Sequence, residues 1–223
     1  MNSTTIEIVV GALLAISITI AVEFLRKPKL KLRVGPPSDP TYESGDRPAA
    51  EARFLGAELL NQPLPALFRW MQRSAALQCH GTITFHHLDG QNVFGRSMPI
   101  RWSATPEPAP LQFIVDKTRV AFFDPSKATI ESRVDVYPGE SQRLDVAVKL
   151  DDEAECYGWS NLNYFSNPVW RHPDWRLSPG RYLVNVTIVS SGESANALFR
   201  LIADVPRKDF RLEPAQPRDT VFP

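Results

Sequence analysis

The chain opens with an almost unbroken apolar stretch. Between Ile6 and Leu25 the only charged residues are Glu7 and Glu23, one near each end. As an α-helix these 20 residues rise about 30 Å, which is the thickness of the hydrocarbon core of a bilayer. A cleaved signal peptide is disfavoured, because residues 1–7 contain no Lys or Arg and no Ala-x-Ala site follows. The pattern predicts a transmembrane helix over residues 6–25, preceded by a short tail at 1–5.

Beyond residue 50 apolar and polar positions alternate with a period of two, as on strands with one buried face. Only residues 64–73 suggest a helix, as a short insertion, and Asp89-Gly90 marks a hairpin turn. Many short strands separated by turns predict a mainly β protein whose soluble part is a β-sandwich. The predicted strands lie at 54–59, 79–86, 130–136, 143–150, 181–188 and 197–205.

Proline-rich segments border this predicted sandwich. The chain holds 20 prolines in 223 residues, nearly twice the ordinary frequency of about 5%. Residues 26–50 are predicted to form a basic collar followed by a Pro-rich linker. Residues 51–205 are the predicted sandwich, and residues 206–223, which include four prolines, a predicted extended tail.

Several short motifs carry a resemblance to a known family. A strand ending at Leu59–Asn61 is followed by Ala75–Cys79, and Tyr137–Ser141 and Pro179–Val184 each open a later strand. This pattern is similar to immunoglobulin-like domains of the bacterial and archaeal adhesion-module type, over roughly residues 50–205. The resemblance implies an immunoglobulin-like sandwich fold. It rests on turns and core positions, so it implies no activity.

The formal net charge of zero hides two segments of opposite sign. Residues 34–223 carry 20 basic and 23 acidic residues, a net of −3, so no duplex nucleic acid is expected as a partner. The positive-inside rule places the basic end of the helix, and with it the soluble domain, in the cytoplasm and the N-terminus outside. The same cations are expected to contact anionic lipid headgroups. They are Arg26, Lys27, Lys29, Lys31 and Arg33.

Two small residues and two cysteines add weaker signals. Gly11 and Ala15 form a small-xxx-small pair of the kind that lets two membrane helices associate, so a homo-oligomer is one expectation. Cys79 and Cys156 are compatible with one disulfide outside the cell or with two buried thiols inside it.

The richest candidate surface is the long connection between two strands, residues 151–180. Its aromatic rings, amides and guanidinium group suit cation–π contacts, stacking or a protein-binding hot spot. The alternative is that the rings fold inward as a satellite core that covers one sheet. The candidate binding residues are Tyr157, Trp159, Tyr164, Trp170, Arg171, His172 and Trp175.

Catalytic and metal-binding patterns are weak. His80 and His86 share a strand face but lie too far apart to bind one ion. The acidic run 151–155 is interpreted as a solvated loop in preference to a calcium site. The sequence contains no Gly-rich phosphate loop, serine nucleophile elbow or zinc-protease helix. No cofactor, metal site or catalytic residue is therefore expected, and the chain is not expected to be an enzyme.

Two functions fit these features. The first is a single-pass, non-enzymatic binding or scaffold protein that presents a cytoplasmic β-sandwich to a protein partner, with residues 157–175 as the contact. The second is a membrane-acting effector whose soluble domain senses a small ligand, of nucleotide type, and controls associated transmembrane helices.

Overall fold

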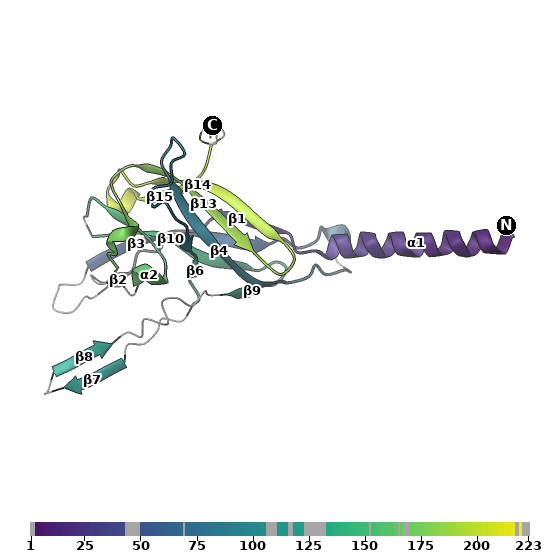
Figure 1. Ribbon diagram of the computed structural model, residues 1–223, viewed down its shortest axis with the longest axis horizontal. Helices are drawn as coiled ribbons and strands as arrows, with labels where there is room; N and C mark the ends of the chain where they lie inside the picture. The colour runs from purple at the N-terminus through teal and green to yellow at the C-terminus, as the bar shows by residue number, and fades with distance from the viewer. Residues whose placement is uncertain are drawn as a thin grey trace.

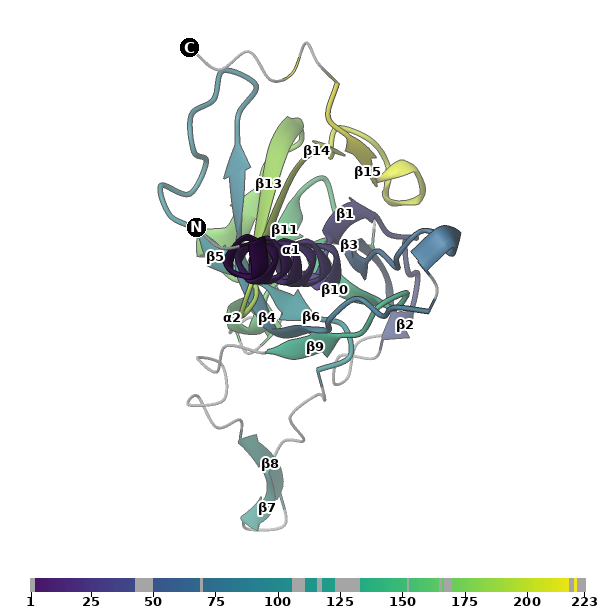
Figure 2. The same cartoon turned by 90° about the vertical axis from the view of Figure 1, so that its right-hand side faces the viewer.

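The computed structural model describes residues 3–42, 50–68, 70–105, 111–115, 118–122, 133–151, 153–164, 166, 170–216 and 219. One long helix, α1 (Ser3–Arg26), projects from a domain built of two antiparallel sheets (Figure 1). Figure 2 looks along α1 and shows the strands arranged around its axis. The prediction of a mainly β protein behind an N-terminal helix is confirmed.

Each sheet has a main path of hydrogen-bonded strands with short strands beside it. The first sheet runs β1 (Leu30–Val34), β3 (Ala50–Asn61), β10 (Ser141–Leu150), β11 (Cys156–Gly158) and β12 (Arg176–Leu177), with β2 (Thr41–Tyr42) on β3 and β6 (Arg101–Trp102) on β10. The second runs β15 (Arg211–Pro214), β14 (Ser194–Ile202), β13 (Arg181–Val189), β4 (Ala76–His86) and β5 (Met98–Pro99), with β9 (Val134–Val136) on β4.

The remaining elements are short. The strands β7 (Leu111–Val115) and β8 (Thr118–Phe122) pair with each other as a separate hairpin. Four helical turns complete the description: η1 (Ala66–Phe68), α2 (Asn161–Tyr164), η3 (Pro173–Trp175) and η4 (Arg207–Asp209).

The core lies between the two sheets, where the alternating apolar residues of each strand meet. On β4, Ile83 and Phe85 are fully buried, whereas Thr82, next to Ile83, is exposed. On β13, the residues Val184 to Ile188 alternate in the same way, and the strand pairs with β4 at seven positions from Leu183 to Val189. The predicted hairpin of β13 with β14 is confirmed, with Val186 opposite Ala197. Burial of one face of each strand is what holds the two layers together.

The structure places two strands outside the predicted limits of the sandwich. The strand β1 lies in the range predicted as collar and linker, where Leu32 enters the core opposite Leu59. The strand β15 lies in the range predicted as an extended tail, where Leu212 pairs with Leu201 and is buried. The two sheets therefore extend beyond the predicted limits 51–205. The strand β1 was missed because the cations around Leu32 alternate with apolar residues, so the segment has a strand pattern as well as a cluster of charge.

Four smaller expectations have mixed outcomes. The insertion at 64–73 is present, but its helix is a single 3-10 turn, η1, because Pro63 and Pro65 remove backbone donors. The Asp89-Gly90 turn is confirmed by the hydrogen bond from the Gly90 amide to His87. Residues 130–132 of one predicted strand lie outside the described residues. Cys79 and Cys156 are both buried free thiols, as expected for the reduced alternative.

A buried amide, Asn61 at the end of β3, joins the exit of α1 to both sheets. Its Oδ1 accepts from the Lys29 amide at 3.2 Å, and its Nδ2 donates to the Ser74 carbonyl at 3.0 Å and the Val136 carbonyl at 3.1 Å. Its own backbone pairs with the turn before β10, at Gly139 and Glu140. Asn61 itself is fully buried, as is its bond to Val136, so water does not readily replace these contacts of the side chain.

We predict that Asn61→Ala lowers the free energy of unfolding by about 2–3 kcal/mol, since it removes the partner of one buried carbonyl, at Val136, and of two part-buried backbone groups, at Lys29 and Ser74. Urea unfolding of the full-length protein in detergent, followed by tryptophan fluorescence, measures this. The matched control is Asn196→Ala, because Asn196 is exposed and bonds only to the Thr187 hydroxyl among the described contacts. Its effect is expected within about 0.5 kcal/mol; equal effects of the two variants would contradict the prediction.

Candidate functional site

The aromatic segment folds inward. Trp159 and Trp175 are 3% and 1% exposed, and Tyr157 is also buried. Trp175 belongs to the main core, where its ring meets Phe94 edge to face at 5.1 Å. The segment therefore covers the first sheet as a satellite core, and its buried tryptophans are not a surface for a protein partner.

Four of the rings form one cluster on the outer face of the first sheet. The ring of Trp159 lies 5.0 Å from Phe54, 5.4 Å from Trp170 and 6.1 Å from Tyr164, each contact near edge-to-face. Such aromatic pairs add stabilisation beyond the area that they bury. Trp170 takes the left-handed backbone conformation, at φ +66°, which is costly for a residue with a Cβ and is held here by the ring contacts.

This cluster forms one wall of a cavity of about 430 Å³, which we call the aromatic cavity. Charged and hydroxyl side chains from β6 and β10 and the segment before β3 form the remaining walls. Its volume lies in the range of pockets that hold small molecules. The lining residues are Ser38, Pro40, Thr41, Phe54, Arg101, Ser103, Arg143, Asp145, Trp159, Tyr164 and Trp170.

Arg101 is the best-held charged group of the aromatic cavity. It is 4% exposed, and its guanidinium group donates to Asn161 Oδ1 at 2.6 Å. Its Nε lies 3.8 Å from Asp145 Oδ2, and its Cζ lies 5.1 Å from the centre of the Tyr164 ring. A buried guanidinium that meets a carboxylate, an amide and an aromatic face in this way has a fixed position.

Asp145 is the only carboxylate among the described lining residues. It accepts a hydrogen bond from Ser103 Oγ at 2.7 Å, and Arg143 Nε lies 3.9 Å from its Oδ1. Burial raises the pKa of Asp145, and the hydrogen bond and the two nearby cations oppose that rise only in part. Two guanidinium groups facing one carboxylate leave the aromatic cavity with a net positive charge, and protonation of Asp145 increases it.

The structure separates the predicted binding residues into three sets. Trp159, Tyr164 and Trp170 line the aromatic cavity, whereas Tyr157 and Trp175 are core residues. The other two predicted residues stabilise the segment itself. Arg171 pairs with Glu153 at 2.7 Å, and His172 Nδ1 accepts from the Asp174 amide at the start of η3.

The sequence reasoning missed Phe54, Arg101, Arg143 and Asp145. Arg143 and Asp145 alternate with apolar residues along β10, so they had the pattern of a solvent-exposed face. The signal available in the sequence was the aromatic excess at 157–175. In the structure Trp159 shares a buried cluster with Val148 and Leu150, which follow the register shift between Asp145 and Ala147 on β10.

The acidic run does not gather into a cation site. Glu153 and Glu155 pair with Arg171 and Arg176, and Asp151 accepts from the Glu51 amide. Asp152 lies outside the described residues. Within the part of the chain that the structure describes, no group of three or more His, Cys, Asp or Glu side chains is placed to hold a metal ion.

The five residues of the basic collar are all exposed around the end of α1 and the start of β1. Arg26 lies 3.7 Å from Glu23, and Arg33 pairs with Glu58 at 2.7 Å. Lys31 alternates with the inward-facing Leu32 on β1. The helix itself is long and apolar enough to cross a membrane, with a span at Glu7–Arg26 of mean hydropathy 2.5 that the domain leaves unburied.

Comparisons of the chain with protein-family models, with curated protein sequences and with solved structures find no match. The resemblance to immunoglobulin-like domains therefore stays a prediction about topology.

We predict that Arg101→Met lowers the free energy of unfolding by about 3–5 kcal/mol at neutral pH, because it leaves Asp145 as a buried carboxylate with less compensation. The pKa of Asp145 is raised in the folded protein, so acidification protonates it in the folded state first, and the loss should shrink as the pH falls through that pKa. Urea unfolding of the full-length protein at neutral and acidic pH measures both effects.

The control for this prediction is Arg143→Gln. Arg143 is 23% exposed at its side chain and lies farther from Asp145, so its loss should lower stability by about 1 kcal/mol or less. A loss in Arg101→Met that does not change with pH would show that the charge of Asp145 is not its cause.

Proposed function

We propose that this chain is a single-pass, membrane-anchored, non-enzymatic binding protein whose cytoplasmic β-sandwich takes up a small anionic ligand with a planar ring in the aromatic cavity. The observation that carries the proposal is the convergence of two guanidinium groups, Arg101 and Arg143, with four aromatic rings on one open cavity. Burial of Trp159 and Trp175 favours this reading over a protein partner docked on residues 157–175.

The charges of the aromatic cavity favour an anion. Arg101 already donates to Asn161 and lies against Tyr164, so it mainly sets the positive potential. Arg143 is less buried, and its contacts are longer, 3.4 Å to the Phe54 carbonyl and 3.9 Å to Asp145. A guanidinium group has five donors. Arg143 therefore has donors to offer a phosphate or carboxylate group that enters.

The aromatic wall favours a planar group beside that anion. The half-buried rings of Phe54, Tyr164 and Trp170 stand around the cavity. Stacking of a base-like ring on such side chains contributes about 1–3 kcal/mol each. A nucleotide-type ligand combines both features. Among the described lining residues none is a histidine or a cysteine, which favours binding over nucleophilic or metal-assisted catalysis.

The anchor in this proposal is α1. Its unburied apolar span supports insertion, and the exposed cations at its C-terminal end support an orientation with the sandwich in the cytoplasm. Gly11 has open space around it, which leaves room for a second helix to approach. Control of helix association by the ligand is a second candidate that rests on this feature.

We predict that nucleoside monophosphates bind the full-length protein in detergent and change its tryptophan fluorescence saturably, because Trp159 and Trp170 line the cavity. Arg143→Gln should weaken this binding about 10- to 100-fold, the equivalent of one charge-assisted hydrogen bond. Titrations with adenosine monophosphate, with adenosine and with inorganic phosphate separate the contributions of ring and anion.

The matched control for ligand binding is Arg211→Gln, which removes an exposed arginine that pairs with Glu213 on β15 and is absent from the cavity lining. Binding should be unchanged there. No saturable response with any of the three probes, or an equal loss in both variants, would overturn the proposed ligand class.

Sidedness is tested separately. In the variant Leu88→Cys, the new thiol stands at an exposed turn, whereas Cys79 and Cys156 are buried with thiol pKa values raised to about 11 and 12. A membrane-impermeant maleimide should label Leu88→Cys only after cells are permeabilised, and the chain without this substitution should stay unlabelled. Labelling in intact cells would place the domain outside.

A further inference from the structure

Two apolar side chains outside α1 have little cover among those whose exposure the structure describes. Leu67 is 81% exposed and Trp70 is 78% exposed, more than any large apolar side chain at positions 7–26 of α1. Both belong to the connection between β3 and β4, residues 63–73, which we call the apolar loop. Leaving a leucine and a tryptophan fully in water is unfavourable, so their exposure points to a contact outside the domain.

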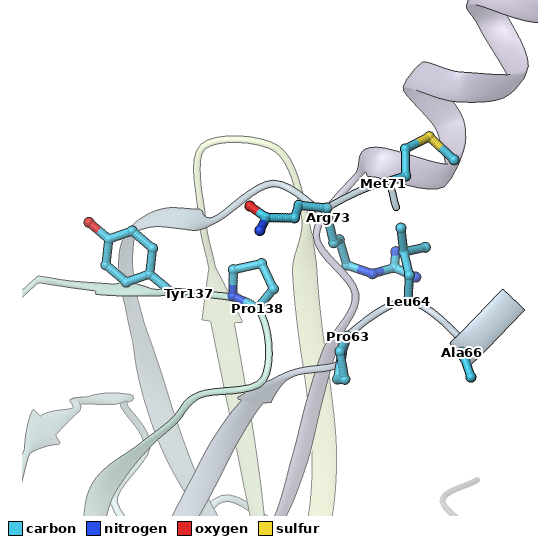
Figure 3. A pocket seen from close by; sticks show the side chains of 8 residues that line it. Pro63, Leu64, Ala66, Met71, Arg73, Tyr137 and Pro138 are labelled. Carbon is cyan, nitrogen blue, oxygen red and sulfur yellow. The ribbon is translucent and has the colours of Figure 1, made fainter. Parts of the chain in front are cut away.

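The apolar loop begins and ends beside the end of α1. The Gln62 amide donates to the Lys29 carbonyl at 2.9 Å, and the Ser74 amide donates to the Arg26 carbonyl at 2.6 Å. Arg73 reaches across with its guanidinium group and donates to the Lys27 carbonyl at 2.6 Å. Figure 3 shows Met71 and Arg73 next to the last turn of the helix. The loop thus lies where the apolar span stops.

Packing inside the domain does not hold the apolar loop against the sheets. None of the residues of η1 is buried. Under the loop lies a cavity of about 600 Å³, shown in Figure 3, that separates it from the turn at Tyr137 and Pro138. In Figure 2 the blue turn of η1 lies to one side of α1, at the edge of the domain. The loop is tethered at its two ends and projects beside the helix.

We propose that the apolar loop inserts Leu67 and Trp70 into the interfacial region of the bilayer that α1 enters, as a second membrane contact of the domain. This inference rests on the proposed membrane anchor. Tryptophan prefers the headgroup level, where its ring is shielded and its N–H stays solvated. The exposed cations Arg26 and Lys27 lie at the same level and suit anionic headgroups.

The occupant is lipid because the ends of the loop are hydrogen-bonded to Arg26, Lys27 and Lys29, the cations that directly follow the apolar span. Leu67 and Trp70 follow Pro63 and Pro65 on a short turn. A segment of this length can lie in the headgroup region of the membrane but is too short to span the bilayer. With two contacts, the domain can no longer swivel about the axis of α1. The elements around the aromatic cavity, β2 and α2, then face away from the membrane, at the far end of the domain (Figure 1).

The test attaches a nitroxide label to Leu67→Cys and, as a matched control, to Leu88→Cys in the full-length protein reconstituted into phosphatidylcholine–phosphatidylglycerol bilayers. The two native thiols are buried, so the label reports the chosen position alone. Both leucines are exposed, but they differ in their distance from α1. The strand β4 starts beside α1 at Ala76 and runs for 11 residues to His86, so Leu88 lies at the opposite end of this strand from α1.

The expected result is a several-fold higher ratio of oxygen to water-soluble nickel-chelate accessibility at position 67 than at position 88. Quenching of tryptophan emission by brominated lipids should agree, and Trp70→Phe should abolish it, because α1 contains no tryptophan. Equal ratios at the two positions, or no quenching that depends on Trp70, would overturn the inference and show that a protein partner or water covers the loop.

Failure of the anchor is distinguished by alkaline carbonate extraction of the same vesicles. Protein that stays in the pellet while position 67 is water-accessible contradicts the apolar loop alone. Protein that is extracted contradicts the membrane anchor, and the loop inference fails with it.

Discussion

The fully buried Asn61 is the point on which the arrangement of helix and sheets depends. One side chain satisfies the backbone where the chain leaves α1, at Lys29, where it enters β4, at Ser74, and where β9 ends, at Val136. A buried backbone group without a partner is costly, so these hydrogen bonds favour the arrangement in which the three segments meet at this amide. The direction in which the helix leaves the domain is therefore influenced by hydrogen bonding inside the domain.

The parts of the fold that follow a single period were predictable from the sequence. The span of α1 and the hairpin of β13 with β14 have patterns that only one element type satisfies. The strand β1 was missed because Lys31 and Arg33 are at once a cationic cluster and the outer face of a strand. Local composition cannot show that Leu32 pairs with a residue of β3, since that pairing depends on the whole sheet.

The aromatic residues of the aromatic cavity were predictable from the sequence, but its charged residues were not. Its rings were visible as a compositional excess, but its charges come from two strands, Arg101 from β6 and Arg143 and Asp145 from β10. The register shift between Asp145 and Ala147 leaves Asp145 in the aromatic cavity at 8% exposure and turns Lys149 toward the end of β14 at 3% exposure. Lys149 donates there to three carbonyl groups, at Ala154, Ala203 and Val205, and Asp145 accepts from Ser103. Where these charged side chains lie is a tertiary fact, and the sequence holds only its indirect trace in the ring-rich segment.

The joint between α1 and β1 has a mechanical consequence. Only Lys27, Pro28 and Lys29 separate the last helical residue from the first strand residue. Proline removes freedom at its centre, and the carbonyls at both ends are held by the domain. So short a connection has little slack, and the helix and sandwich form one stiff lever. For the proposed membrane anchor, a tilt of the helix is then converted into a swing of the far end of the domain, with an amplitude that grows with distance from the joint.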